Sequence, residues 1–314
     1  MGRPLRIEYP DAHYHVTSRG NERKDVFKSQ KDREKFLGYL ESAVFRYGAI
    51  IHAYCLMSNH YHLLLETPCG NLSQIMQHIN GAYTNYFNVK RKRSGHLFQG
   101  RFKAIIIEAD EYAQELSRYI HLNPVRVGMV SRPEDYQWSS YNDYVGQRKA
   151  PGWLKTDFVL AYFGKEITDA QKKYRKFVED LIDEKYDSPL LESVAGTILG
   201  SNEFVSEITE RHIDGKQFDR DLPAIKQLSN RPTVNKIIQT ANSGLGEERL
   251  STKASIYLCH RYSGVKLKEI GERFGIGESA VSQTSRRFAQ QLDKDKALNK
   301  VVKEIKEILN LSEV

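Results

Sequence analysis

Two histidines that flank a single tyrosine are the residues of this chain whose types and spacing best suit chemistry. They occur as His60-Tyr61-His62, directly after a polar turn at 57–59 and directly before three leucines. Side chains alternate across a β-strand, so residues i and i+2 lie on one face with backbones about 7 Å apart. Neutral imidazoles are good ligands for divalent metal ions. If this segment is a strand, its spacing predicts a metal site.

A second pair, His13-Tyr14-His15, has the same spacing. Either pair could bind the ion, or adjacent strands could bring all four histidines together. Two features favour His60 and His62. The leucines at 63–65 are typical of a strand deep within a sheet, and the polar turn before His60 could admit a substrate.

A tyrosine and an asparagine four residues apart follow in the segment 118–130. On a helix, Tyr119 and Asn123 share a face and His121 points elsewhere. Asn123 could offer a carbonyl oxygen as a third metal ligand, with the Tyr119 hydroxyl beside the ion. Tyrosine is a known covalent nucleophile. Its ordinary pKa near 10 means that it needs a polarised electrophile, such as a phosphate held by a divalent metal.

Alternating strand and helix signals surround these residues. Hydrophobic periodicity predicts that the first 148 residues form an α/β sandwich. A proline is expected to end the helix that carries Tyr119. The predicted strands are 13–18, 50–56, 61–66 and 104–108, and the predicted helices are 32–47, 72–89 and 111–122, the last ended by Pro124.

Three motifs in a fixed order resemble a known family. His-Tyr-His after Met-Ser-Asn, then Gly-Arg-Phe-Lys at 100–103, then Tyr-Ile-x-x-Asn-Pro-Val-Arg-x-Gly from Tyr119 resemble the IS200-like single-tyrosine HUH transposases. The pattern looks most like the branch associated with repetitive extragenic palindromes. The resemblance covers roughly residues 5–145. It implies a ferredoxin-like α+β sandwich that cleaves and rejoins single-stranded hairpin or palindromic DNA through a 5′-phosphotyrosine link.

The same resemblance implies a role for individual residues. Tyr119 matches the nucleophile, and His60, His62 and Asn123 match the ligands of Mg²⁺ or Mn²⁺. Two other functions remain open from the sequence. One is a catalytically idle DNA-binding regulator, and the other is a relaxase-like or replication-initiator-like nickase with the same chemistry.

The charge of the chain is concentrated in its N-terminal half. Residues 1–150 hold 21 Lys/Arg against 15 Asp/Glu, and residues 151–314 hold 26 against 25, which together give the net charge of +7. A phosphate-rich partner is the natural inference, and ordinary solubility charge is the alternative that charge alone leaves open. Phe98 and Phe102 could stack on unpaired bases. The candidate DNA contacts are Arg19, Asn21, Arg23, Lys90, Arg91, Lys92, Arg93, Arg101 and Lys103. The run at 90–93 would also suit a solvated helix end.

The last 69 residues contain a second DNA-binding pattern. Residues 267–274, a glycine-rich turn at 275–277 and residues 278–288 predict a helix-turn-helix, with Ile270, Phe274, Ile276 and Val281 as its apolar contacts. The core resembles the DNA-binding domain of the bacterial replication initiator DnaA, but Glu-Ser-Ala-Val-Ser at 278–282 replaces that family's recognition turn. A small helical bundle that serves assembly is the alternative. The predicted groove-facing residues, through which duplex DNA would bind, are Ser279, Ser282, Gln283 and Arg286.

Composition sets the remaining expectations. Three scattered cysteines, with no Cys-x-x-Cys pair, argue against disulfides and a thiolate zinc site. No apolar run reaches membrane-spanning length, and the N-terminus lacks a secretory core. A cytoplasmic, nucleoid-associated protein without a membrane partner is therefore expected. We predict a catalytic domain over 1–148, a helical linker domain of unknown role over 149–245, and the helix-turn-helix domain over 246–314.

Overall fold

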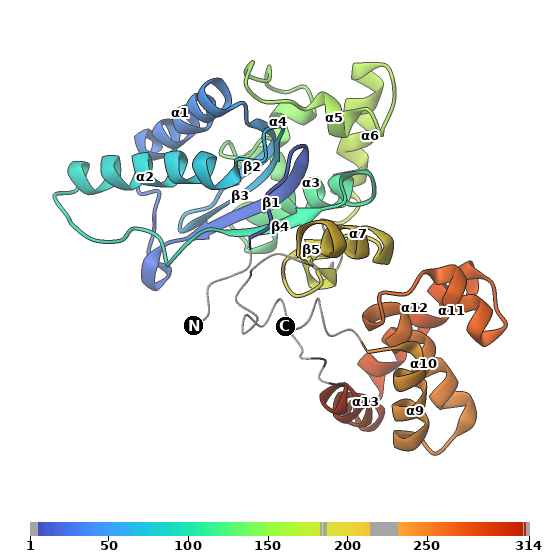
Figure 1. The fold of residues 1–314 in the computed structure, drawn as a ribbon. Coiled ribbons are helices and arrows are strands. Elements are labelled where there is room, and N and C mark those ends of the chain that lie inside the picture. Colours follow the sequence, from blue (N-terminus) through green and yellow to red (C-terminus); the bar gives the residue numbers. More distant parts are fainter. Residues whose placement is uncertain (1–5, 183, 185–186, 214–231, 310, 312–314) are drawn as a thin grey trace. The chain divides into compact units, whose positions relative to one another are not determined.

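A computed structural model describes residues 6–182, 184, 187–213, 232–309 and 311. Part of the predicted linker domain, residues 214–231, lies outside the described residues. By packing, the chain divides into two compact units, one formed by residues 6–193 with 197–199 and the other by residues 194–196 with 200–314. Each unit is described by itself below (Figure 1).

The first unit is built on a five-stranded sheet with the order β2-β3-β1-β4-β5. The first four strands pair antiparallel, and β5 pairs parallel with β4. The chain order β-α-β-β-α-β combined with this strand order is the ferredoxin-like arrangement, so the predicted fold class is confirmed. Only β5 has no counterpart among the predicted strands. The strands are β1 Ala12–Arg19, β2 Ile50–Leu56, β3 His60–Thr67, β4 Lys103–Ile107 and β5 Ile198–Leu199.

Helices α1 (Gln30–Tyr47) and α2 (Leu72–Lys90) cover one face of the sheet. Their aromatic rings meet the strands there, with Phe36 lying 4.8 Å from Tyr61 and 5.1 Å from Tyr83 between ring centroids. Strand alternation directs the residues on either side of Tyr61 to the opposite face. His60 and His62 therefore point away from α1 and α2.

Helix α3 (Ala109–Arg126) covers that opposite face and runs through Pro124. The prediction that Pro124 ends the helix was wrong. Proline removes one backbone N–H, but near a helix end this costs a single hydrogen bond, and the last turn persists to Arg126. The amide of Val127 still bonds to the Asn123 carbonyl at 3.3 Å.

Three further helices extend the layer formed by α3, namely α4 (Tyr141–Tyr144), α5 (Asp157–Leu160) and α6 (Ile167–Glu179). Their apolar side chains share one core with α3 and with inward residues of β2 and β3. This packing explains why the first compact unit extends beyond residue 148. The short 3-10 turns of the unit are η1 Asn21–Arg23, η2 Pro133–Asp135 and η3 Pro189–Glu192.

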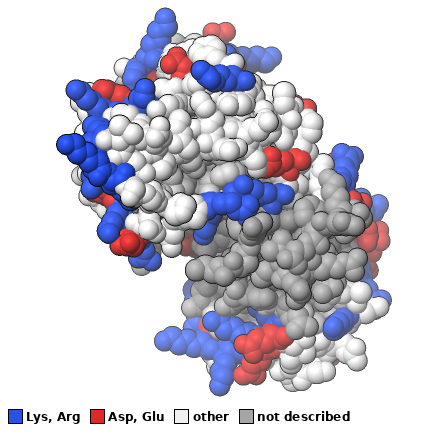
Figure 2. All heavy atoms as spheres, turned by 60° about the vertical axis from the view of Figure 1, so that its left-hand side comes forward, with Lys and Arg blue, Asp and Glu red and all other residues white. Residues whose placement is uncertain are grey.

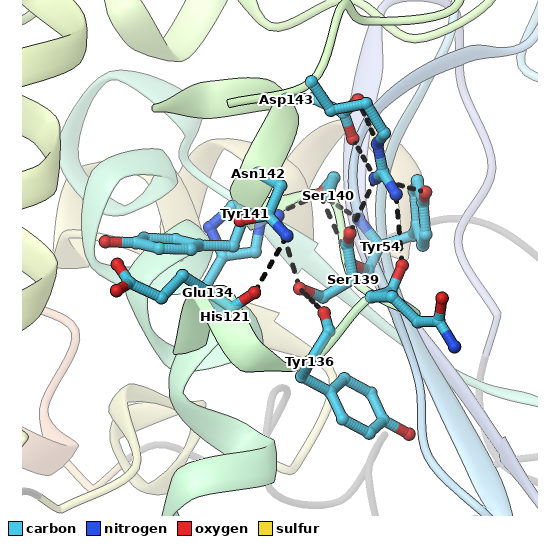
Figure 3. Close-up of polar contacts among 11 residues, drawn as sticks. Tyr54, His121, Glu134, Tyr136, Ser139, Ser140, Tyr141, Asn142 and Asp143 are labelled. Carbon is cyan, nitrogen blue, oxygen red and sulfur yellow. Dashed lines mark hydrogen bonds and ion pairs between the residues drawn. The ribbon is translucent and has the colours of Figure 1, made fainter. Parts of the chain in front are cut away.

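His121 is directed into this second layer and away from the sheet. Its Nδ1 lies 2.7 Å from the Tyr174 hydroxyl and its Nε2 lies 2.8 Å from the Ser140 hydroxyl. Ser140 also bonds to the backbone of Tyr54, which connects α3, α4 and β2 in one buried network (Figure 3). The prediction that His121 points elsewhere than Tyr119 is confirmed.

The second unit is helical. Its core is formed mainly by α10 and α12, with Leu258, Ile270, Val281 and Phe288 almost fully buried. Helix α11 is followed by a turn and then α12. Gly271 permits this turn, because a Cβ at that position would lie 2.5 Å from the Ile276 carbonyl oxygen. The helices are α7 Asn202–His212, α9 Val234–Gly244, α10 Glu248–Tyr262, α11 Leu267–Phe274, α12 Glu278–Lys294 and α13 Lys296–Ile308.

Helices that could cross a lipid bilayer are absent from the described residues, since none combines the required length with the required apolar character.

Candidate active site

His60 and His62 stand on one face of β3, as their spacing predicts. Their ring centroids are 4.9 Å apart and the rings lie edge to face. His62 is buried with an exposed fraction of 6%, whereas His60 is half-buried at the first residue of the strand. The pair thus offers one enclosed imidazole and one that solvent can reach.

The ring nitrogens of both histidines are arranged in the same way. Nδ1 of His60 lies 2.6 Å from the Asn59 side-chain oxygen, and Nδ1 of His62 lies 2.9 Å from Nε2 of His15. Nδ1 of His60 donates to the Asn59 oxygen, which leaves a lone pair on its Nε2. Nε2 of His62 carries a lone pair in the tautomer in which its Nδ1 donates to His15. Nε2 of His62 is buried without a hydrogen-bond partner.

The second histidine pair is divided between two places. Antiparallel pairing of β1 with β3 sets Thr17 opposite His62 and brings His15 against it, with ring centroids 5.2 Å apart. His13 lies opposite Glu66, toward the other end of the sheet. The sequence left open whether one pair or all four histidines come together. The strands bring together His15, His60 and His62 but not His13.

Tyr119 approaches this histidine group from α3. Its ring centroid lies 5.7 Å from that of His62 and 6.2 Å from that of His15, edge-on to both. The tyrosine is half-buried, and the guanidinium of Arg126 lies 5.3 Å from its ring centroid. Residues from the sheet and from α3, more than 50 positions apart in the chain, thus meet at one place.

Asn123 lies one helical turn beyond Tyr119 and is 92% buried. Its side-chain N–H donates to the Tyr119 carbonyl oxygen at 2.7 Å. This bond fixes the orientation of the amide. It uses the N–H group and not the side-chain carbonyl oxygen, which is the atom that a cation would bind.

Burial keeps the histidines neutral. Burial, with a smaller contribution from the positive charge of Arg19, lowers the pKa of His60 to about 4. Burial, followed by the neighbouring His15, His60 and Arg19, lowers the pKa of His62 well below its usual range. Burial alone lowers the pKa of His15 to about 3. All three imidazoles are therefore uncharged near pH 7 and can act as ligands or hydrogen-bond partners.

These residues fit a divalent cation. The unpartnered Nε2 of buried His62 and the Nε2 of His60 are ligands of the kind that Mn²⁺ and related ions accept. Asn123, one turn beyond Tyr119 on α3, has an amide oxygen of a kind that such ions also accept. Sequence reasoning did not assign roles to Asn59 and Arg126, and it considered His15 only as a possible metal ligand. The i, i+2 relation of His15 to His13 was visible, but only the strand register shows that His15 touches His62.

The candidate DNA contacts of the first unit differ in their surroundings. Arg19, Asn21 and Arg23 are exposed at the end of β1 beside the first histidine of the pair. Figure 2 shows basic side chains gathered along the margin of one face of this unit, around a largely uncharged centre. Arg101 and Lys103 are also exposed. Phe98 and Phe102 are 6% exposed, so their rings serve the core and not base stacking.

The four basic residues at the end of α2 form two pairs with different surroundings. Lys90 bonds at 2.7 Å to Asp32, and Arg91 also pairs with this carboxylate, which is fully buried. Lys92 and Arg93 are exposed. Lys90 and Arg91 thus stabilise the fold, whereas Arg93 donates only to the exposed loop, at the His96 carbonyl oxygen 3.2 Å away.

In the second unit, one face of α12 carries the predicted groove-facing residues. Ser279, Gln283 and Arg286 are exposed and Ser282 is half-buried, whereas Val281 and Phe288 face the core. The exposed face continues into an open hollow lined by Arg287, Gln290, Gln291, Lys294, Asp295 and Lys296.

Comparisons with known proteins gave three findings. The chain is similar to a solved structure described as "Structure of the REP associates tyrosine transposase bound to a REP hairpin", with 19% identity and a TM-score of 0.41 over 54% of this chain and 94% of that chain. No curated protein matches the chain. Residues 8–123, the stretch that contains His60, His62, Tyr119 and Asn123, match the family model described as "Transposase IS200 like".

Proposed function

We propose that this protein is a DNA transposase that cleaves and rejoins single strands through Tyr119. The family match over residues 8–123 supports a DNA-processing enzyme of this class. The observation that carries the proposal is the meeting of Tyr119 with His62 and His15 across 5.7 and 6.2 Å. A tyrosine that served only the core would have no need of two neutral imidazoles against its ring.

The reaction is a transesterification. The Tyr119 hydroxyl attacks a backbone phosphorus, the phenolic proton is lost to solvent, and the bond to the 3′ oxygen breaks. The products are a 5′-phosphotyrosine link and a strand with a free 3′-hydroxyl, to which a proton is added. Since one ester replaces another, a later 3′-hydroxyl can attack the phosphotyrosine and rejoin the strands.

His60, His62 and Asn123 would hold Mg²⁺ or Mn²⁺. Such an ion would polarise the scissile phosphate and orient it. Among the protein groups, Arg126 lies over the Tyr119 ring and favours the developing phenolate, and Asn123 orders the turn of α3 that carries the nucleophile.

The exposed basic residues suit a hairpin or palindromic single strand. Arg19 is the last residue of β1 and pairs with His60, and Asn21 and Arg23 follow it in the chain. A DNA backbone bound by these residues would therefore reach the histidines. The α11–α12 pair, which resembles a helix-turn-helix, would bind duplex DNA through the exposed face of α12. A protein with these substrates would act at the nucleoid in the cytoplasm.

Substitution of Tyr119 by Phe tests this proposal. Tyr119→Phe removes the nucleophilic oxygen and retains the ring, so we expect no covalent adduct with labelled single strands from the gene's own flanks. Hairpin affinity should stay within about fivefold, since a lone hydroxyl contributes about 1 kcal/mol or less to binding. Denaturing gels with Mn²⁺ measure the adduct, and gel shifts measure binding.

Tyr112→Phe is the matched control, because Tyr112 lies two turns earlier on α3. It should form the adduct at the normal rate. An adduct that persists in Tyr119→Phe contradicts the proposal. A wild-type protein that binds palindromic strands but never nicks them would indicate a DNA-binding regulator instead.

A further inference from the structure

A second cluster of metal-binding side chains lies on the same sheet face as His62. Nε2 of His13 and Nε2 of His52 approach one oxygen of Glu66 at 3.3 and 3.1 Å. The three ligand atoms all lie within 4.8 Å of one another. The candidate active site uses none of these residues. Glu66 and His62 are four residues apart on β3, about 13 Å, so one ion cannot serve both groups.

A β-bulge brings His52 into this cluster. The register of β2 against β3 shifts between Ile51 and Ala53, and His52 is the extra residue. Ala53 faces the α3 layer, so regular alternation would direct His52 to the other face, toward α1 and α2. The bulge redirects the imidazole, a use of bulges common beside functional sites.

Backbone groups contact both imidazoles. Nδ1 of His52 lies 3.3 Å from the Lys155 carbonyl oxygen, and the backbone of Asp11 hydrogen-bonds to the His13 ring. Nε2 of His13 has no hydrogen-bond partner. The Nε2–H of His52 can donate to Glu66 at 3.1 Å. In the alternative tautomer, with both ring hydrogens on the backbone side, two imidazole lone pairs and the carboxylate face one another. A cation resolves this repulsion.

The surroundings of the cluster match a metal site. The Phe158 ring lies 4.8 Å from the His52 ring and 5.2 Å from the His13 ring, which shields the imidazoles on one side. Side-chain exposures of 16% for His13 and 19% for Glu66 leave a path for an ion and a water molecule. In a tetrahedral zinc site with bonds near 2.0–2.1 Å, neighbouring ligand atoms lie about 3.3 Å apart. The distances from the two Nε2 atoms to the Glu66 oxygen are close to this value.

We propose that His13, His52 and Glu66 bind a divalent transition-metal ion, preferentially Zn²⁺, with water as the fourth ligand. Two imidazoles and one carboxylate are a zinc ligand set. The ion would join β1, the bulge of β2 and β3, and would therefore stabilise the first unit. This inference stands independently of the proposed DNA chemistry.

Zinc binding to the full-length protein tests the inference. Zn²⁺ should raise the Tm of the first unit by about 5 °C or more at 100 times the dissociation constant. Glu66→Gln should weaken zinc binding more than about 100-fold, because loss of a direct ligand exceeds the 10–100-fold effect of losing an outer partner. Calorimetric titration measures the affinity, and thermal unfolding with and without Zn²⁺ measures the shift.

Three further variants complete the test. The double substitution His60→Ala with His62→Ala should retain the zinc-dependent rise in Tm, and so should His96→Ala, which removes an exposed histidine. His13→Gln should lose the rise and serves as a second ligand variant if Glu66→Gln fails to fold. A rise of normal size in both ligand variants, or no rise in the wild type, would overturn the inference.

Discussion

His15 holds His62 by the ring nitrogen that a metal ion would not use. The contact is 2.9 Å between Nε2 of His15 and Nδ1 of His62, and both rings are buried. Such outer partners fix the tautomer and the orientation of a ligating imidazole. We therefore assign His15 a positioning role at the candidate site.

Removal of this partner should weaken metal use more than DNA binding. In His15→Ala, we expect the Mn²⁺ concentration for half-maximal adduct to rise about 10–100-fold, because the His62 ring loses its orientation. Adduct yield measured across a Mn²⁺ series checks this. His78→Ala, which alters a half-buried histidine bonded to Ser42 on the far face of the sheet, should leave the series unchanged. Equal Mn²⁺ dependence in wild type and His15→Ala would argue against the positioning role.

At the scale of elements, Asp32 connects the start of α1 to the end of α2. Ser29 caps α1, and the fully buried carboxylate of Asp32 accepts hydrogen bonds from Lys90, the Lys28 amide and Arg91. Burial would raise the pKa of Asp32, but these bonds outweigh it and lower the pKa below 3.8. The basic side chains are thus part of the fold.

This network makes stability depend on pH in the acid range. Because the folded-state pKa lies below the unfolded value, the contribution is fully present above about pH 4 and is lost as pH falls through the folded pKa. Asp32→Asn should lower the free energy of unfolding by about 3–5 kcal/mol at pH 7, with a smaller loss at pH 3. Urea unfolding at several pH values measures both. A constant difference between wild type and variant across pH 3–7 would contradict the assignment.

The same run of basic residues separates stability from binding. Lys92→Ala with Arg93→Ala should weaken hairpin binding with little effect on Tm. The slope of log affinity against log salt should decrease by up to about 2, because up to two phosphate contacts are lost. Lys90→Ala with Arg91→Ala should instead lower Tm, since it leaves Asp32 buried without its cations. Gel shifts over a salt series and thermal unfolding distinguish the pairs. If Lys90→Ala with Arg91→Ala lowers affinity without lowering Tm, this division is incorrect.

At the scale of the whole molecule, each of the two compact units carries a candidate DNA surface. The first unit has the tyrosine and the histidines, and the second has the exposed face of α12 with Ser279, Gln283 and Arg286. The buried side of α12 packs in the core of the second unit through Val281 and Phe288. Duplex binding and strand cleavage should therefore respond to different substitutions.

Arg286→Ala with Arg287→Ala tests this separation. Duplex affinity should fall, and the slope of log affinity against log salt should decrease by about 1–2, because one or two phosphate contacts are lost. Adduct formation on a short hairpin should be unchanged. Lys300→Ala, an exposed basic residue on α13, is the control and should alter neither. Equal loss of hairpin cleavage and duplex binding would show that the units share one DNA surface.

Local sequence patterns predicted much of this molecule. The strand and helix segments up to residue 126 lie within a few residues of their predicted positions, because periodicity reports which face of each element is buried. The i, i+2 and i, i+4 spacings placed His60 with His62 and Tyr119 with Asn123 on shared faces. Pro124 was misjudged because one missing hydrogen bond in a last turn is inexpensive. The catalytic and DNA-binding roles stay predictions until the experiments above.

The sequence by itself determined the order of strands and helices in the first unit, the paired imidazoles and the tyrosine, since these depend on residues near one another in the chain. Only the tertiary structure decided which distant side chains meet. The register of β1 brings His15 to His62, and the bulge of β2 brings His52 to His13 and Glu66. Helix packing brings Lys90 and Arg91 to Asp32. Register and packing arise from the cooperative burial of whole faces, which no short segment encodes alone.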